Sequence, residues 1–192
     1  NIASQVTNNA SFNCNAAKIV VVSEGWTQRD AFWQLLRDVL AEVPPRIAYY
    51  PGAQDRFATL TAGKDKALRL GQATADRLPW TMIRGLDPAA KDEPLFSTEP
   101  FCSILSEVAL TEREPAAFLT AAAAFANDKL WGTLSCSIYI HPRTERSSEV
   151  ATALDMAVGS LRYGLVAINH WPGVGYGMMT PSWGGHPSAT LQ

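Results

Sequence analysis

Cys14 is the residue of this sequence whose type and setting are most suited to chemistry. It lies in the polar, turn-forming segment 9–15, just before the β-branched run 19–22. A thiol that a turn delivers to the edge of a sheet can act as a nucleophile if its surroundings favour the thiolate. The alternative is a small apolar filler, which is what a lone cysteine usually is. Cys102 and Cys136 fall inside predicted strands, so we expect both in the core.

The histidines offer a base for a second kind of thiol chemistry. His141 ends a predicted strand, where we expect it to be solvated, whereas His170 and His186 flank the last loop. A Cys14 thiolate with one of these two as base would make a thiol esterase or hydrolase, although nothing in the sequence links the pair. No two cysteines or histidines have the spacing of zinc ligands, so we predict no metal site.

The last loop is rich in glycine and aromatic residues. Its glycines have the spacing G-x-G-x-G, and residues 178–181 do not open a helix. The dinucleotide fingerprint needs a helix directly after its glycines, so we reject a nucleotide-binding loop here. The aromatic residues Trp171, Tyr176 and Trp183 are left with two interpretations. They fold back on the domain, or they line an apolar pocket.

Strands and helices alternate along the chain and would position these residues. The segment 18–23, with unbroken β-branched residues at 19–22, predicts a strand covered on both faces. An apolar stripe of helical spacing follows and ends at Pro44-Pro45, and Thr27 with Asp30 has the spacing of a capping box. Further strands are predicted at 80–84, 102–110, 133–140 and 165–169, and further helices at 64–76, 116–126 and 145–163. We therefore predict a single α/β domain over residues 1–192, with a mostly parallel sheet flanked by helices.

Composition limits the class of protein. The chain has 192 residues, 47% of them hydrophobic and 18% charged, with a net charge of -2, which argues against disorder and against binding to nucleic acid or an anionic membrane. No apolar run approaches the roughly 20 residues of a membrane span. Three cysteines indicate reduced thiols and a cytoplasmic protein. The chain starts without methionine and ends without a closing element, so we expect a fragment of a longer protein.

Five segments, taken in order, carry a family resemblance. They are Asn9 to Cys14, Glu99-Pro100-Phe101, Asn127 to Ser135, Arg162 to Asn169, and Trp183-Gly184-Gly185. Together they resemble the catalytic domain of the aldehyde dehydrogenase superfamily over nearly the whole chain. Ser11-Phe12 stands where the family usually has glycine-glutamine, and Cys102-Ser103 where it commonly has glycine-proline. These departures indicate a divergent branch.

The resemblance implies a mechanism and a set of roles. The Cys14 thiolate would attack an aldehyde carbon to form a thiohemiacetal, hydride would pass to NAD or NADP, and water would release the acid from a thioester. Glu99 would hold the nicotinamide ribose, Phe101 would pack near the nicotinamide ring, and the Cys14 backbone N–H would supply part of the oxyanion site. The aldehyde pocket would be lined by His170, Trp171, Tyr176 and Trp183.

The resemblance also implies what a longer enzyme would add. The family's nucleotide-binding domain, its glutamate base and the amide that completes its oxyanion hole come before this region, and its oligomerisation strand comes after Gln192. We therefore expect the full-length enzyme to be a homo-oligomer and the fragment alone to be inactive with NAD or NADP. A thiol esterase that uses Cys14 and a non-catalytic interaction domain with an inert cysteine remain the alternatives.

Overall fold

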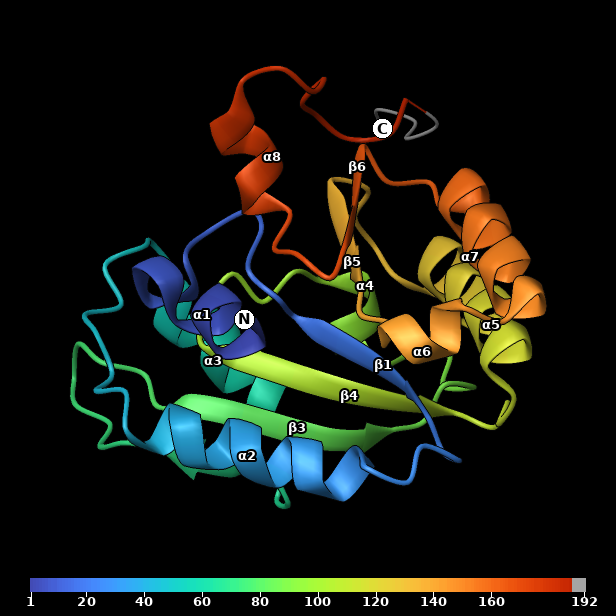
Figure 1. The fold of residues 1–192 in the computed structure, drawn as a ribbon. Helices are drawn as coiled ribbons and strands as arrows, with labels where there is room; N and C mark the ends of the chain where they lie inside the picture. The colour runs from blue at the N-terminus through green and yellow to red at the C-terminus, as the bar shows by residue number, and fades with distance from the viewer. Residues whose placement is uncertain (188–192) are drawn as a thin grey trace. The chain divides into compact units, whose positions relative to one another are not determined.

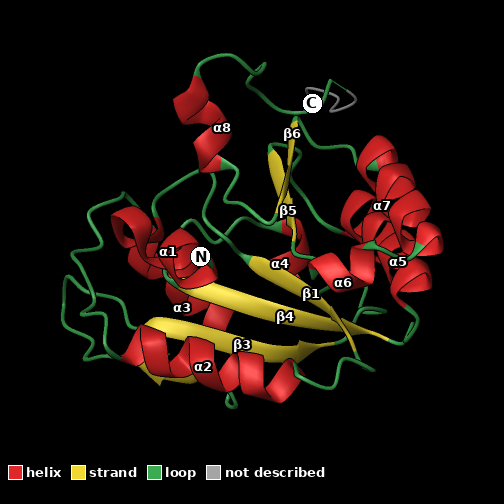
Figure 2. Ribbon diagram, viewed as in Figure 1, coloured by secondary structure: helices red, strands yellow, loops and turns green. Residues whose placement is uncertain are grey.

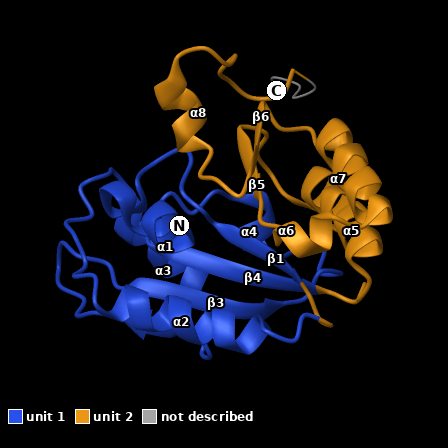
Figure 3. Cartoon of the chain, in the orientation of Figure 1, with its two compact units in different colours: residues 1–22, 26–109 blue, residues 23–25, 110–192 orange. Residues whose placement is uncertain are grey.

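The computed structural model describes residues 1–187 and has an α/β architecture (Figures 1 and 2). The chain divides into two compact units (Figure 3). Unit 1 comprises residues 1–22 and 26–109, and unit 2 comprises residues 23–25 with the described residues from 110 onward. Within the described residues, no helix is both long and apolar enough to cross a membrane.

Unit 1 is built on a four-stranded sheet. The strand order is β1 (Ile19–Ser23), β4 (Ile104–Leu110), β3 (Trp80–Leu86) and β2 (Leu68–Leu70). Strands β3 and β4 are parallel, and β2 is an antiparallel edge strand. The register of β3 against β4 shifts between Ile83 and Leu86, where Gly85 has a φ of 73° that a side chain would oppose. The predicted α/β fold with a mostly parallel sheet is confirmed.

Helix α2 (Arg29–Ala41) supplies the core of unit 1 with one apolar face. Trp33, Leu36 and Leu40 recur at helical spacing and pack with Trp80, Met82 and Leu105 of the sheet. The helix begins two residues after Thr27, and its cap residue Gln28 makes no side-chain capping bond, so the predicted capping box is wrong.

Short helices complete unit 1. They are α1 (Ile2–Thr7), the 3-10 helix η1 (Asn8–Ser11), α3 (Ala53–Thr61) and α4 (Pro94–Ser97). The predicted helix at 64–76 is wrong, because that segment contains β2 and turns, and Gly71 has a φ of 81° that a helix interior does not allow. The helix of this region lies earlier, in α3.

Unit 2 pairs two parallel strands with helices. β5 (Ser135–Ile138) runs parallel to β6 (Leu165–Ile168), and α5 (Pro115–Lys129) packs with α7 (Ser148–Ser160). The helix predicted over 145–163 is α7, which begins later and ends earlier than predicted, and the short helix α6 (Pro142–Glu145) precedes it. The prediction of loop alone after β6 is also wrong, since α8 (Gly173–Met178) forms there despite its glycines.

Candidate active site

The segment that carries Cys14 is a strained turn. Asn9, Ala10 and Ser11 have φ values of 50°, 56° and 69°, in the left-handed region that non-glycine residues avoid. Such conformations cost on the order of 1–3 kcal/mol each and persist where the surroundings over-determine them. The Asn9 amide contributes part of this compensation, because its Nδ2 donates to the Phe12 carbonyl and to the Tyr49 hydroxyl, both at 2.8 Å.

Cys14 is the exposed thiol of the chain. Its Sγ lies 3.5 Å from the amide Nδ2 of Asn15, and among residues 1–187 its backbone N–H donates no hydrogen bond. Cys102 is buried and Cys136 half-buried, as predicted for core residues. Burial raises the pKa of each of these two thiols to about 11, which keeps both protonated at neutral pH. Cys14 is therefore the cysteine that solvent-borne molecules reach.

Lys18 ties this turn to the start of strand β4. Its Nζ donates to the carbonyl and the hydroxyl of Ser11, both at 2.9 Å, and to the Cys102 carbonyl at 3.2 Å. Burial lowers the Lys18 pKa from 10.5 to about 8, a shift that Cys102 and Glu99 oppose. At neutral pH Lys18 is thus a charged ammonium whose three protons all have acceptors.

Aromatic rings join the Cys14 turn to the predicted cofactor segment. The ring of buried Phe12 lies 6.1 Å from that of Phe101, and Tyr50 contacts both, at 5.7 Å and 4.7 Å between centroids. Tyr49 meets Phe12 edge-on at 5.1 Å. Two segments that are about 85 residues apart in the sequence, around Cys14 and Phe101, are therefore neighbours in unit 1.

Arg56 of α3 holds the backbone of that second segment. Its guanidinium donates to the carbonyls of Pro100 at 3.1 Å and Phe101 at 3.3 Å, and Phe101 has a φ of 40°. Glu99 is an exposed residue just before this bend. Partial desolvation raises the pKa of its carboxyl, and the positive charges of Lys18 and Arg56 act in the opposite direction. Lys18 and Arg56 thus place two positive charges near Glu99.

The four predicted substrate-pocket residues belong to unit 2, whereas Cys14, Glu99 and Phe101 belong to unit 1. Within unit 2, Tyr176 of α8 packs edge-on against Trp183 at 5.1 Å. His170 is exposed, and its carbonyl accepts a hydrogen bond from the Ser137 hydroxyl at 3.2 Å. The two aromatic residues are thus one cluster.

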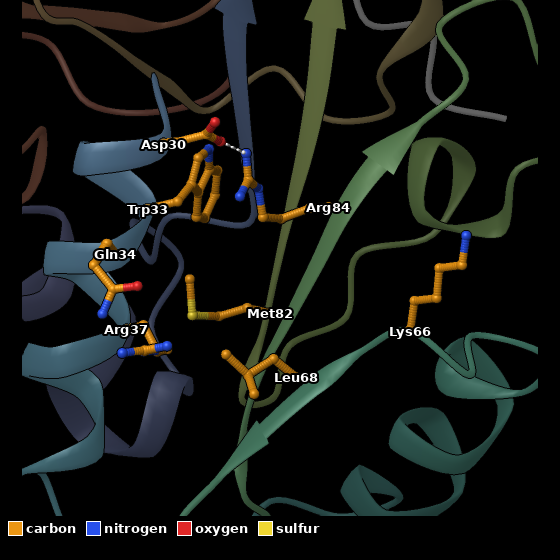
Figure 4. A pocket seen from close by; sticks show the side chains of 8 residues that line it. All are labelled: Asp30, Trp33, Gln34, Arg37, Lys66, Leu68, Met82 and Arg84. Atoms are coloured by element: carbon orange, nitrogen blue, oxygen red, sulfur yellow. Dashed lines mark hydrogen bonds and ion pairs between the residues drawn. The ribbon is translucent and has the colours of Figure 1, made fainter. Parts of the chain in front are cut away.

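A cavity of about 300 Å³ opens elsewhere in unit 1, between α2 and the β2–β3 edge (Figure 4). Arg84 pairs with Asp30 at its rim, and the Lys66 side chain points away from the other lining residues. No residue of the predicted site lines it. Within residues 1–187, no three His, Cys, Asp or Glu side chains are grouped to hold a metal ion.

Sequence reasoning did not single out Lys18, Arg56, Tyr49 or Tyr50. Lys18 carries a weak signal, a lone cation at the start of a buried β-branched run, where a solvated lysine is not expected. Arg56 and the two tyrosines lie in a stretch without clear periodicity. Only the fold shows that the tyrosines contact Phe12 of the Cys14 turn and that Arg56 bonds the Pro100 carbonyl.

No protein-family profile matches the sequence, and no curated protein is similar to it at the sequence level. Solved structures do match the fold. An NAD-dependent aldehyde dehydrogenase from Sinorhizobium meliloti superposes with a TM-score of 0.66 at 22% identity, over 88% of this chain and 33% of that one. The fold of this chain is the aldehyde dehydrogenase fold.

Two further aldehyde dehydrogenase-fold structures support the match. The indole-3-acetaldehyde dehydrogenase of P. syringae, in complex with NAD+, has a TM-score of 0.68 at 16% identity over 88% of this chain and 34% of its own. A glyceraldehyde-3-phosphate dehydrogenase from Methanocaldococcus jannaschii, complexed with NADP, has a TM-score of 0.66 at 15% identity over 89% and 36%. The chain therefore spans about a third of the length of these dehydrogenases.

Proposed function

We propose that the chain is the catalytic domain of an NAD(P)-dependent aldehyde dehydrogenase-like enzyme, with Cys14 as its nucleophile. The observation that carries the proposal is the convergence of the Cys14 turn with Glu99-Pro100-Phe101 in one unit of an aldehyde dehydrogenase fold. A cysteine, a glutamate and a phenylalanine that the fold brings together from distant parts of the sequence support an aldehyde site more strongly than separate sequence motifs do.

The chemistry at Cys14 follows from its exposure and from the turn. The thiolate attacks the carbonyl carbon of an aldehyde, and the oxygen becomes an oxyanion. The Cys14 backbone N–H, which makes no hydrogen bond within residues 1–187, is a donor for that oxyanion. Protonation of the oxygen gives the thiohemiacetal.

The residues beside the turn fit one end of a nicotinamide cofactor. Glu99 presents an exposed carboxylate that accepts hydrogen bonds from ribose hydroxyls, and half-buried Phe101 offers an apolar ring edge nearby. NAD or NADP, when bound, supplies the acceptor for the aldehyde hydride. Under this proposal Glu99 and Phe101 orient the cofactor, and His170, Trp171, Tyr176 and Trp183 shape the aldehyde pocket.

The same proposal includes the wider enzyme. The substrate is a small aldehyde, and the chain works as part of a longer, homo-oligomeric protein in the cytoplasm, a location that the expected reduced cysteines support. The 192-residue chain by itself produces no NADH or NADPH from aldehyde. Aldehyde-dependent absorbance at 340 nm with the pure chain would contradict this last point.

The nucleophile itself is tested with a ¹³C-labelled aldehyde and the 192-residue chain. We expect a hemithioacetal carbon signal in the NMR spectrum that saturates at lower aldehyde concentration than for a peptide of residues 9–18. Cys14→Ser removes the signal, whereas Cys102→Ser, which alters a buried thiol, leaves it unchanged. A signal that persists in Cys14→Ser refutes the proposal, as does equal affinity for chain and peptide.

A further inference from the structure

Two cations pin the two backbone segments that meet beside Cys14. Lys18 uses all three protons of its ammonium on Ser11 and Cys102, and Arg56 bonds the carbonyls of Pro51, Pro100 and Phe101. Each pinned segment contains left-handed residues, three around Ser11 and one at Phe101. The contacts are therefore made where the backbone is least able to hold its conformation alone.

Lys18 is the group that connects the segments directly. Ser11 has no exposed surface, so its carbonyl and hydroxyl have no access to bulk water, and the ammonium satisfies both. The third bond, to the Cys102 carbonyl, lies just past the Phe101 bend. The hydrogen bonds of the Lys18 Nζ atom thus set the distance between the Cys14 turn and the Glu99–Phe101 segment.

Few charged or titratable groups of the described structure act on Lys18. The charged or titratable groups that act on it are Cys102, Glu99 and Arg56, and its Nζ lies 5.9 Å from the centre of the Phe101 ring. Within residues 1–187 its Nζ makes no ion pair with Glu99, and its hydrogen bonds go to carbonyl and hydroxyl oxygens. That is how a side chain stabilises a backbone conformation.

We propose that Lys18 is a positioning residue for the nucleophile: by holding the turn 9–11 against the start of β4, it aims the Cys14 backbone N–H at the oxygen of a carbonyl under attack. The inference rests on the proposed function, since it concerns the same thiol. It adds a residue that acts through the turn without touching the substrate. Ser11 is the acceptor through which it acts.

Two reactions of the Cys14 thiolate separate this role from general stability. Acylation by 4-nitrophenyl acetate forms a C–S bond, passes through an oxyanion and expels 4-nitrophenolate. Alkylation by iodoacetamide forms a C–S bond and expels iodide with no oxyanion. Both need the thiolate and access, and only acylation needs the aimed N–H. The ratio of the two rate constants at Cys14, resolved by peptide mass spectrometry, therefore reports the geometry of the turn.

We expect Lys18→Met to lower Cys14 acylation by about 10²-fold, the usual effect of one lost oxyanion donor, and alkylation by less than about threefold. Lys18→Arg restores part of the ratio because it keeps a cation. Ser11→Ala, which removes one of the three acceptors and leaves the core intact, lowers the ratio less. Lys66→Met is the matched control, an exposed lysine of unit 1 that lies at the cavity beside α2.

Several outcomes overturn the proposal. One is a ratio of the acylation to the alkylation rate constant that is unchanged in both Lys18→Met and Ser11→Ala. Another is a fall of both rate constants by the same factor. If Lys18→Met does not fold, the Ser11→Ala ratio decides. If Cys14 of the wild type is acylated no faster than the peptide of residues 9–18, the proposed function fails. Hydrogen exchange then tests the positioning role alone. Faster exchange of the hydrogen-bonded amides of Phe12 and Asn15 in the Lys18 or Ser11 variant supports it, and unchanged exchange refutes it.

Discussion

Glu107→Gln is predicted to be among the most destabilising conservative changes in unit 1. Glu107 lies in β4 with no exposed side-chain surface. Its carboxylate accepts hydrogen bonds from Arg29 Nε at 2.7 Å, Trp33 Nε1 at 2.5 Å and Arg84 Nε at 3.0 Å. Glu107 thereby links α2 to the sheet. The Cys14 turn lies at the other end of the same sheet, before β1.

The magnitude follows from burial. Glutamine keeps the shape of the side chain but removes the charge and turns one acceptor into an N–H donor that faces a cation. Breaking a buried ion pair costs about 3–5 kcal/mol, because it leaves the partners' charges uncompensated. The control is Asp30→Asn, which removes a 2.9 Å pair with the same Arg84, but its side chain is 92% exposed. Exposed pairs contribute about 0–1 kcal/mol.

The assay is urea denaturation at pH 7 followed by circular dichroism. We expect the free energy of unfolding to fall by about 3 kcal/mol more in Glu107→Gln than in Asp30→Asn. Equal losses, or a loss below about 1 kcal/mol for Glu107→Gln, would refute the reasoning.

The dependence of stability on pH gives an independent check that the charged Glu107 carboxylate is stabilising. Burial raises the Glu107 pKa, but the hydrogen bonds from Arg29 and Arg84 outweigh it and hold the pKa below its ordinary 4.5. Its contribution is therefore fully present above pH 4.5 and is lost as the pH falls through the folded-state value. The difference between wild type and Glu107→Gln should accordingly shrink in acid.

Two further predictions concern unit 2. Asn127 donates to the Ser160 carbonyl at 2.8 Å and accepts from the Arg162 backbone N–H at 2.7 Å, so Asn127→Ala should cost about 1–3 kcal/mol in thermal unfolding; an unchanged melting temperature would contradict this linking role. Burial raises the Cys136 pKa from 9.0 to about 11, so the unfolded thiol ionises first and stability falls as the pH rises from 9 to 11. Cys136→Ala should reduce that alkaline loss by roughly 2 kcal/mol, and an equal loss in the variant would show that another group causes it.

The main elements follow from periodicity in the sequence, and the exceptions have physical reasons. The β-branched run before Ser23 and the alternation around Cys136 predict β1 and β5 because strands that pack on a core need those residues. Helix α8 was not predicted because glycine has low helix propensity. In the structure Gly175 packs closely on Leu165, and a Cβ there would lie 2.6 Å from a Leu165 methyl carbon, so that side chain would have to shift. That close approach is a tertiary constraint, which no local pattern contains.

The site residues could be predicted from the sequence, but the residues that hold them in place could not. Cys14, Glu99 and Phe101 were named from motifs, and the structure brings their segments together. The roles of Lys18 and Glu107 depend on acceptors and donors far away in the sequence, such as Cys102 and Arg29. A sequence pattern does not show which distant groups a side chain contacts, so neither role is visible in it.

The most direct test of the central claim, that Cys14 is an activated nucleophile, is its rate of acylation by 4-nitrophenyl acetate at pH 7 in the folded chain relative to a peptide of residues 9–18. We expect acylation about 10²-fold faster in the folded chain, with a single acetyl group on Cys14, because the turn fixes the direction of the Cys14 backbone N–H, which the flexible peptide does not. A rate equal to or below that of the peptide would contradict the claim and identify Cys14 as an inert surface thiol.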